Sequence, residues 1–355
     1  MHPIFMTKFK LYSGPVIQPL NHLVLVFCLL LVGSAIAQNV EDNVKDLGKE
    51  EAALRGNAKS LLLEKNFEEL DKLAVQYHNS TERVSGGVWK LRHLSEGMAY
   101  PDDRKSPEQW EQLLSHLNQW REKSGTAFSL NVLGHCQLNR AWSIRGYSFA
   151  GGVDKDNWGD FRDWVAKAET SLMEAVKQDP QCTDAYKSLL HVGISQGWPK
   201  SKMEETFHKA IKVAPEYYDY YYNMAFYKME RWYGTEGEWQ KFLNSIPDLV
   251  PGDQGFVIYA RTAVKLYPYY GKDFYGKENN RVQWDKMKRG FETMLAQYPS
   301  IFNQNKYAMM AMGAWDKMVA TRVFMDLEKK NHLFPEAWGG EAYLAQAKTW
   351  YEENK

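Results

Sequence analysis

The sequence predicts an all-α fold built from antiparallel helix pairs that stack side by side. The first observation is a set of similar helical phrases that end in proline, EAVKQDP, KAIKVAP, TAVKLYP and TMLAQYP. The second is their spacing, because 35 residues separate Pro180 from Pro215 and 36 separate Pro299 from Pro335. Helix-pair repeats have a period of about 34 residues. The third is that no segment shows the period-two alternation of a half-buried strand.

The clearest repeat runs from Thr183 to Pro215. Leu190, Phe207, Ala210 and Pro215 have the spacing at which a tetratricopeptide unit places a leucine, a large aromatic residue, a small residue and a proline. The small residue allows two helices to approach closely, and the aromatic ring fills the groove beside it. His191 stands where the unit usually has glycine, so the match is degenerate. The predicted fold is a tetratricopeptide-like α-solenoid.

The other helices are predicted from apolar spacing and from residues typical of helix ends. Apolar residues predict two helices on either side of Glu64-Lys65-Asn66, and a third from Val88 to Met98 after the break at Gly86-Gly87. Ser106-Pro107-Glu108 is typical of a helix start. The long loop from Pro268 to Asn280 is of a kind that is often functional. Further helices are expected at Thr126–Phe149, Trp158–Lys177, Tyr217–Met229, Glu236–Ser245, Gln254–Leu266, Val282–Gln297, Phe302–Gly313, Lys317–Lys329 and Glu336–Glu352.

The N-terminus has the pattern of an export signal. Lys8 and Lys10 precede a short apolar run from Leu23 to Val32, and Ala35-Ile36-Ala37 predicts cleavage before Gln38. An uncleaved anchor is the alternative, although the apolar run is short for a spanning helix. We therefore expect a signal peptide at 1–37, a leading helix or arm at 38–60 and a helical-repeat domain at 61–355, in a periplasmic or extracellular protein without a membrane span after cleavage.

Charge and cysteine content narrow the classes of partner. The 44 basic and 44 acidic residues balance, which argues against nucleic acid and against attraction to an anionic membrane. An oxidising compartment would permit a disulfide between Cys136 and Cys182. The alternative is a pair of buried free thiols, since helix-borne cysteines seldom meet the geometry that a disulfide requires.

Motifs for catalysis, cofactors and metals are missing from the sequence. The histidines form no H-E-x-x-H pattern, and the chain has neither C-x-x-C nor a phosphate-binding glycine loop. It also lacks G-x-S-x-G, and Cys136 beside His135 has no base that faces the thiol. We expect no catalytic residue, no cofactor and no metal site.

Aromatic residues and one arginine are the remaining candidates. Five tyrosines crowd residues 217–222, and they cannot all face one side of a helix. Such rings are common in binding sites, whereas core packing is the alternative. Arg145 lies in an apolar helix, and we expect it to pair with Asp160 or Asp163; an exposed or anion-binding arginine is the alternative. The candidate binding groove consists of Tyr217, Tyr218, Tyr221, Trp232, Tyr233 and Trp239.

Three longer phrases carry a family resemblance. LNRAWSIRGYSFAGGV with WGDFRDWVAKAETSL, WPKSKMEETFHKAIKVAPEYYDYYYNMAFYKMERWYG, and WDKMKRGFETMLAQYPSIFNQNKYAMMAMGAWDK together resemble a bacterial domain family of unknown function, DUF4034. The similarity covers Leu61 to about Trp350. Arg231-Trp232-Tyr233-Gly234-Thr235 departs from the family's Lys-Trp-Gly-Gly-Ser, so a tight Gly-Gly turn is not expected there. The resemblance implies a helical, tetratricopeptide-like fold and no reaction.

These observations favour an exported helical-repeat protein that binds or scaffolds a protein or peptide and has no catalytic activity. A purely structural protein of the cell envelope is an alternative. An α/α-toroid enzyme acting on carbohydrate is a further one, and it would require two carboxylates facing each other across a cleft.

Overall fold

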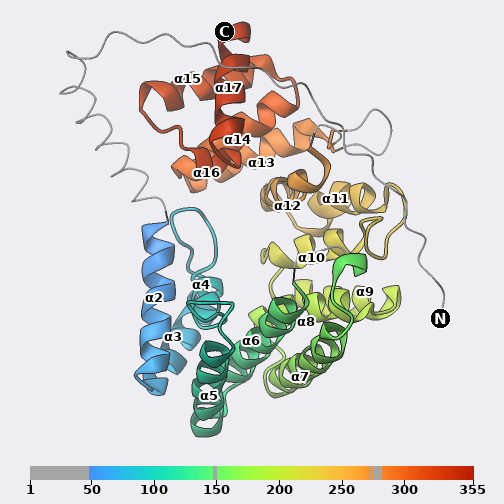
Figure 1. The fold of residues 1–355 in the computed structure, drawn as a ribbon. Coiled ribbons are helices and arrows are strands. Elements are labelled where there is room, and N and C mark those ends of the chain that lie inside the picture. The colour runs from blue at the N-terminus through green and yellow to red at the C-terminus, as the bar shows by residue number, and fades with distance from the viewer. Residues whose placement is uncertain (1–47, 147–149, 272–273, 276–281) are drawn as a thin grey trace, which may run out of the picture. The chain divides into compact units, whose positions relative to one another are not determined.

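The computed structural model describes residues 48–146, 150–271, 274–275 and 282–355, all within the compact unit Asp42–Lys355. These residues contain sixteen α-helices, one 3-10 helix and an isolated β-bridge between Arg83 and Trp89, and no strand (Figure 1). The all-α prediction is confirmed. The predicted signal peptide, residues 38–47 of the predicted arm and part of the loop Pro268–Asn280 lie outside the described residues.

The helices follow the chain in a simple order. They are α2 (Lys49–Leu63), α3 (Phe67–Ser80), α4 (Lys90–Gly97), α5 (Pro107–Ser124), α6 (Ala127–Arg145), η1 (Ala150–Gly152), α7 (Asn157–Gln178), α8 (Thr183–Gln196), α9 (Lys200–Val213), α10 (Asp219–Tyr227), α11 (Glu238–Leu249), α12 (Gln254–Tyr270), α13 (Trp284–Gln297), α14 (Ile301–Gly313), α15 (Lys317–Lys329), α16 (Pro335–Trp338) and α17 (Glu341–Asn354).

Three of the repeat prolines end their helices in the same way. Pro180, Pro215 and Pro299 each stand two residues after the last residue of α7, α9 and α13. The residue between, Asp179 in the first case, has an extended backbone with φ −134° and ψ 97°. A proline ring disfavours the helical conformation in the residue before it, so the helix stops there.

Each helix packs on the next, and alternate helices also touch. From α5 to α15 every consecutive pair is in contact, as are α6 with α8, α8 with α10, and α10 with α12. Phe207 of α9, the predicted repeat aromatic, packs edge-on against Tyr221 of α10 and Phe242 of α11, with ring centroids 5.4 Å apart in both pairs. One helix pair thus buries the apolar side of the next, as in an α-solenoid.

Four boundaries differ clearly from the prediction. The expected helix Thr126–Phe149 already ends at Arg145, because Gly146 leaves the helical conformation with a φ of 73°. Pro268 lies inside α12, which continues to Tyr270, because a proline this close to the C-terminus removes only one hydrogen bond of the last turn. The expected helix Glu336–Glu352 is two helices, since Gly339 and Gly340 take positive φ angles of 95° and 125°. The expected boundary at residue 61 falls inside α2, whose residues 58 and 62 are both buried.

Candidate functional site

Every second helix of the stack, from α6 to α12, contributes to the same side of the stack. Residues from α6, α8, α10 and α12 line a common cavity. We call the surface made by these four helices the inner face. In a stack of helix pairs, this is the surface that remains available after each pair has packed on the next.

A segment of the chain itself, residues 82–97, lies across the inner face. It consists of a turn followed by α4, which contacts both α6 and α8 (Figure 1). Ser95 Oγ lies 3.2 Å from His135 Nδ1 on α6. Arg92 Nη1 lies 3.3 Å from Asp219 Oδ2 at the start of α10. We call residues 82–97 the inserted segment.

The glycine pair in this segment forms a turn against α12 and α14. The carbonyl oxygen of Gly86 accepts hydrogen bonds from Arg261 Nη2 at 2.6 Å and from Asn303 Nδ2 at 3.3 Å. Gly87 has a φ of 78°, and a Cβ at this position would lie 2.5 Å from Arg261 Nη2 and 2.6 Å from the ring of Tyr298. Glycine is therefore required for the turn to approach the helices so closely.

Beside the inserted segment, the inner face contains a cavity of about 640 Å³, which we call the His191 cavity. Aromatic rings from three helices and a turn line it, among them Trp142, Tyr222, Phe226, Trp232 and Tyr269. Five cationic residues outnumber two carboxylates in its lining. These charged residues are Arg92, Arg145, Lys187, Arg231, Lys265, Glu96 and Asp219.

Asp219 is the centre of an ion network in this cavity. Its carboxylate is 4% exposed and lies 2.6 Å from Lys265 Nζ and 3.3 Å from Arg92. Burial alone would raise the pKa of Asp219, but Arg92 and Lys265 outweigh that effect and lower it to about 2. Arg92 also holds Glu96 at 2.7 Å. The network therefore fastens α4 to α10 and α12.

A second buried carboxylate, that of Asp184, forms an ion pair with Lys187 of the cavity lining. Lys187 Nζ lies 2.7 Å from Asp184 Oδ1, which also accepts a hydrogen bond from the hydroxyl of Tyr217 at 2.6 Å. Asn131 Nδ2 donates to the other oxygen at 3.2 Å. Although burial favours the neutral acid, Lys187 and His135 hold the pKa of Asp184 well below its usual range. The charges at the base of the cavity are therefore mutually paired.

Two histidines in the cavity are neutral at pH 7. Burial, together with the charge of Lys187, lowers the pKa of His135 to about 3 and that of His191 to about 4. His191 stacks on Trp142, with ring centroids 5.5 Å apart and an angle of 21° between the planes. The residue that replaces the usual glycine of the repeat therefore contributes a flat, uncharged ring to the site.

Two hydrogen-bond donors among the residues that line the cavity are buried without a hydrogen-bond partner in the described part of the chain. They are the hydroxyl of Ser188, which is 1% exposed, and the indole Nε1 of Trp232. Buried polar groups are nearly always hydrogen-bonded in proteins. Both atoms are enclosed by neighbouring side chains, so a bound molecule would reach these donors only after those side chains move.

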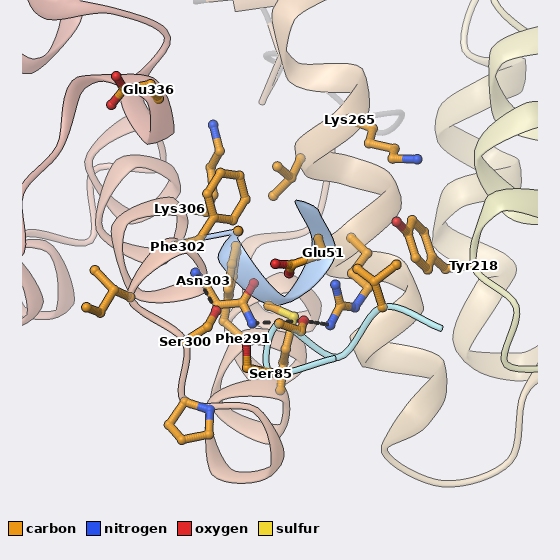
Figure 2. Close-up of a pocket in the computed structure, with 18 of the residues that line it drawn as sticks. Glu51, Ser85, Tyr218, Lys265, Phe291, Ser300, Phe302, Asn303, Lys306 and Glu336 are labelled. Atoms are coloured by element: carbon orange, nitrogen blue, oxygen red, sulfur yellow. Dashed lines mark hydrogen bonds between the residues drawn. The ribbon is translucent and has the colours of Figure 1, made fainter. Parts of the chain in front are cut away.

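A larger cavity of about 930 Å³ lies beside the Gly86-Gly87 turn, and we call it the Lys306 cavity (Figure 2). Side chains from α2, the turn, α12, α13 and α14 line it. Lys265 lines both cavities. Most of the lining is apolar, and its charged members are Glu51, Arg261, Lys265, Lys306 and Glu336.

The predicted groove residues are divided between the core and the inner face. Tyr217, Tyr221 and Trp239 are at most 1% exposed, so the alternative interpretation, core packing, holds for them. The hydroxyl of Tyr221 donates to the carbonyl of Pro215 at 2.7 Å, which explains a tyrosine rather than a phenylalanine there. Tyr233 stacks on Tyr227 and donates to the carbonyl of Ile194 at 2.9 Å.

Tyr218 and Trp232 are the predicted residues that the structure places at the cavities. Trp232 lines the His191 cavity, and Tyr218 lines the Lys306 cavity. The cations of Arg92, Arg261 and Lys265 lie 5.5, 5.4 and 4.7 Å from the ring centroid of Tyr218. Tyr218 therefore sits in a strongly positive environment where its ring face attracts cations.

Arg145 and the cysteines complete the predicted set. The guanidinium of Arg145 lies over the rings of Trp142 and Trp158, at 5.0 and 5.3 Å, and donates to the carbonyl of Gly146. Asp160 lies close enough to Arg140 to act on that residue's pKa; the expected pairing of Arg145 with Asp160 or Asp163 stays a prediction. Cys136 and Cys182 are free, buried thiols. Burial raises the pKa of both.

Sequence reasoning missed most of the charged residues of the inner face. Arg92, Lys187, Asp219 and Lys265 stand in ordinary amphipathic stretches, and no local pattern marks them as neighbours. One residue did mark the site in the sequence. His191 replaces the glycine of the repeat, and it lines the His191 cavity. The glycine pair Gly86-Gly87 indicates, from the sequence alone, only a break between helices.

Comparison of the chain with protein-family models finds no match, and comparison with curated proteins finds none either. Among the residues that the structure describes, no helix combines the length and apolarity that crossing a bilayer requires. The same residues contain no cluster of histidine, cysteine and carboxylate side chains suited to a metal ion.

Proposed function

We propose that this protein is an exported binding protein without catalytic activity, and that it holds an acidic segment of a partner protein in the His191 cavity. The observation that carries the proposal is the composition of this cavity, in which aromatic rings surround an excess of cations. Rigid aromatic residues and arginines supply most of the energy at protein-binding sites. Arg231 at the mouth, which lies over the ring of Tyr269 at 5.3 Å, is placed to meet a carboxylate.

The electrostatics of the cavity also support binding over hydrolysis. A glycosidase requires one carboxyl group with a raised pKa to act as the acid. The two carboxylates of this lining have the opposite property. Burial would raise the pKa of both, but Arg92 with Lys187 lowers that of Glu96, and Arg92 with Lys265 lowers that of Asp219 to about 2. Both remain ionised at pH 7 and have no proton to donate.

Selection from a random peptide library displayed on phage tests the proposal. Peptides selected on the wild-type protein are expected to be enriched in Asp and Glu and to carry an aromatic or apolar anchor. Their affinity is then measured by fluorescence anisotropy on variants of the cavity. Trp232→Ala and Arg231→Glu are each expected to weaken binding at least tenfold, because both remove a contact at the centre or mouth of the site.

Matched controls come from exposed residues of the same types. Trp315→Ala removes a tryptophan that is 68% exposed, and Arg322→Glu reverses an exposed charge on α15. Both are expected to bind the selected peptides like the wild type. Selected peptides without acidic residues, or peptides that bind all four variants equally, would contradict the proposal.

A further inference from the structure

The Lys306 cavity contains charged groups that the protein itself leaves without a counter-charge. Lys306 and Arg261 line the cavity, and neither has a carboxylate within ion-pair distance among the described residues. The Oε2 of Glu51 is buried there and has no hydrogen-bond partner. Because buried charges are expensive unless paired, two unneutralised cations and one unpartnered carboxylate oxygen in a single cavity require an explanation.

The opposite charges of the cavity come from different helices and form no ion pair with each other. Glu51 comes from the first turn of α2 and lies against the Gly86-Gly87 turn, where a Cβ at Gly86 would be 3.7 Å from Glu51 Oε1. Lys306 comes from α14, where its ammonium lies 5.4 Å from the ring centroid of Phe302. Figure 2 shows the two side chains on separate walls. A single small ion cannot satisfy both, whereas a molecule with opposite charges at its two ends can.

The space between the walls is apolar. Val88, Val264, Phe291, Met294 and Ile301 line it. A volume of about 930 Å³ lies within the range of roughly 300–1,000 Å³ that small-molecule sites have. Burial without any charged partner also lowers the pKa of Lys306, so a carboxylate placed beside its ammonium would gain a poorly solvated counter-ion.

We propose that the Lys306 cavity binds a short apolar peptide with free ends, whose ammonium group meets Glu51 and whose carboxylate meets Lys306. Arg261 adds positive potential for the carboxylate but keeps its hydrogen bond to the carbonyl of Gly86. Two residues of extended chain span about 7 Å, which keeps the two end charges of the peptide apart. The apolar side chains occupy the lining between them. This site is distinct from the one proposed for a partner protein, and either can fail without the other.

Isothermal titration calorimetry with leucyl-leucine and its capped forms tests the proposal on the wild-type protein. Leucyl-leucine is expected to bind. N-acetyl-leucyl-leucine lacks the ammonium, leucyl-leucinamide lacks the carboxylate, and each is expected to bind at least about tenfold more weakly, the usual effect of losing a hydrogen bond to a charged group. Glycyl-glycine has both charges without the apolar body and is expected not to bind detectably.

Two variants assign the ends of the peptide to the residues. In Glu51→Gln the free and the acetylated peptides are expected to bind equally, because the charge that recognises the ammonium is gone. In Lys306→Met the preference for the acid over the amide is expected to fall to the small part that the more distant charge of Arg261 supports. The controls are Glu64→Gln at the C-terminal cap of α2 and Lys317→Met on α15, both exposed residues. They are expected to distinguish the free from the capped peptides as well as the wild type does. Circular dichroism establishes that all four variants are folded.

Three results would overturn the proposal. One is that leucyl-leucine gives no binding heat at millimolar concentration. Another is that the capped and free peptides bind the wild-type protein with equal affinity. The third is that octanoate, an apolar anion without an ammonium group, binds as tightly as leucyl-leucine. The series on the wild-type protein requires no substitution, so the test remains valid even if a variant fails to fold.

Discussion

The His191 cavity and the Lys306 cavity contain charged residues in comparable number, seven and five, but in opposite states. In the His191 cavity, Arg92, Lys187 and Lys265 each have a carboxylate within 3.3 Å. In the Lys306 cavity, Arg261 and Lys306 have none within ion-pair distance in the described part of the chain. The difference indicates two uses of charge. In the His191 cavity the paired charges hold the inserted segment in place, and Arg231, which has no ion pair among the described residues, is left for an acidic partner. In the Lys306 cavity the unpaired charges remain for a small ligand.

Removing the carboxylate of Asp219 from the His191 cavity is expected to have the largest effect on stability. Asp219→Asn leaves Arg92 and Lys265 buried without their shared counter-ion, and breaking such a pair costs about 3–5 kcal/mol of unfolding free energy. Urea denaturation followed by circular dichroism measures it. Asp253→Asn is the control, because its pair with Arg289 is half exposed and contributes less than about 1 kcal/mol. Equal effects of the two substitutions would remove the distinction between structural and surface pairs.

We expect three buried, neutral histidines to make the protein sensitive to mild acid: His135 and His191 of the His191 cavity, and His93 on α4. The pKa of His191 and of His93 is about 4, and that of His135 about 3, in the folded state, against about 6.5 in the unfolded chain. The unfolded state therefore binds more protons between these values, and stability falls as the pH falls below about 6.5. Each unit of pKa depression corresponds to about 1.4 kcal/mol.

Thermal unfolding between pH 8 and pH 4.5 measures this dependence. The carboxylates of the network, whose pKa values are lowered, lose their contribution only as the pH falls through and below about 4, so the window above that reports the histidines. His191→Gln keeps a neutral polar side chain and is expected to flatten the pH profile by one histidine's share. A melting temperature that does not change between pH 7 and pH 4.5 would mean that these rings are accessible to water.

The contact between α4 and α2 is so close that a single methyl group added at Gly97 is expected to lower the stability. A Cβ at Gly97 would lie 2.4 Å from the carbonyl oxygen of Arg55. Because the obstacle is backbone, Gly97→Ala is expected to lower the unfolding free energy by about 1–3 kcal/mol. Gly56→Ala, on α2 with no atom within 4 Å of its Cβ, is expected to raise it by about 0.5–1 kcal/mol. Chemical denaturation of the two variants measures both changes in unfolding free energy. A Gly97→Ala variant as stable as the wild type would show that α4 is not packed tightly against α2.

What the sequence predicted well is local in the chain. Pro180, Pro215 and Pro299 set the ends of three helices because each restricts the residue before it. Phe207 and Ala210 pack as the repeat pattern predicts because their spacing fixes their place on α9. These features require no knowledge of distant residues.

What the sequence did not predict is the inserted segment and the cavities on either side of it. The contact of Gly86 with Asn303 joins residues 217 positions apart, and Arg92 meets Asp219 from α4 across the inner face. No spacing rule links such pairs. The tyrosines at 217, 218 and 221 could not be sorted for a different reason. Helical period alone does not tell which of several adjacent rings faces the core, and Tyr221 is decided by a backbone carbonyl that accepts its hydroxyl proton.

The smallest expected effect on the free energy of unfolding comes from the Lys306 cavity. Its sign is opposite to that of Asp219→Asn. Lys306 is a half-buried cation whose charge has no counter-ion in the described structure, and burial lowers its pKa. Lys306→Met keeps the apolar stem and removes the charge, so it is expected to raise the unfolding free energy by about 0.5–1 kcal/mol. Lys317→Met on the exposed surface of α15 is expected to change it by less than about 0.5 kcal/mol. Urea denaturation without added peptide measures both. A clear loss of stability in Lys306→Met would mean that the ammonium is already paired within the protein, and the contrast between the two cavities would then disappear.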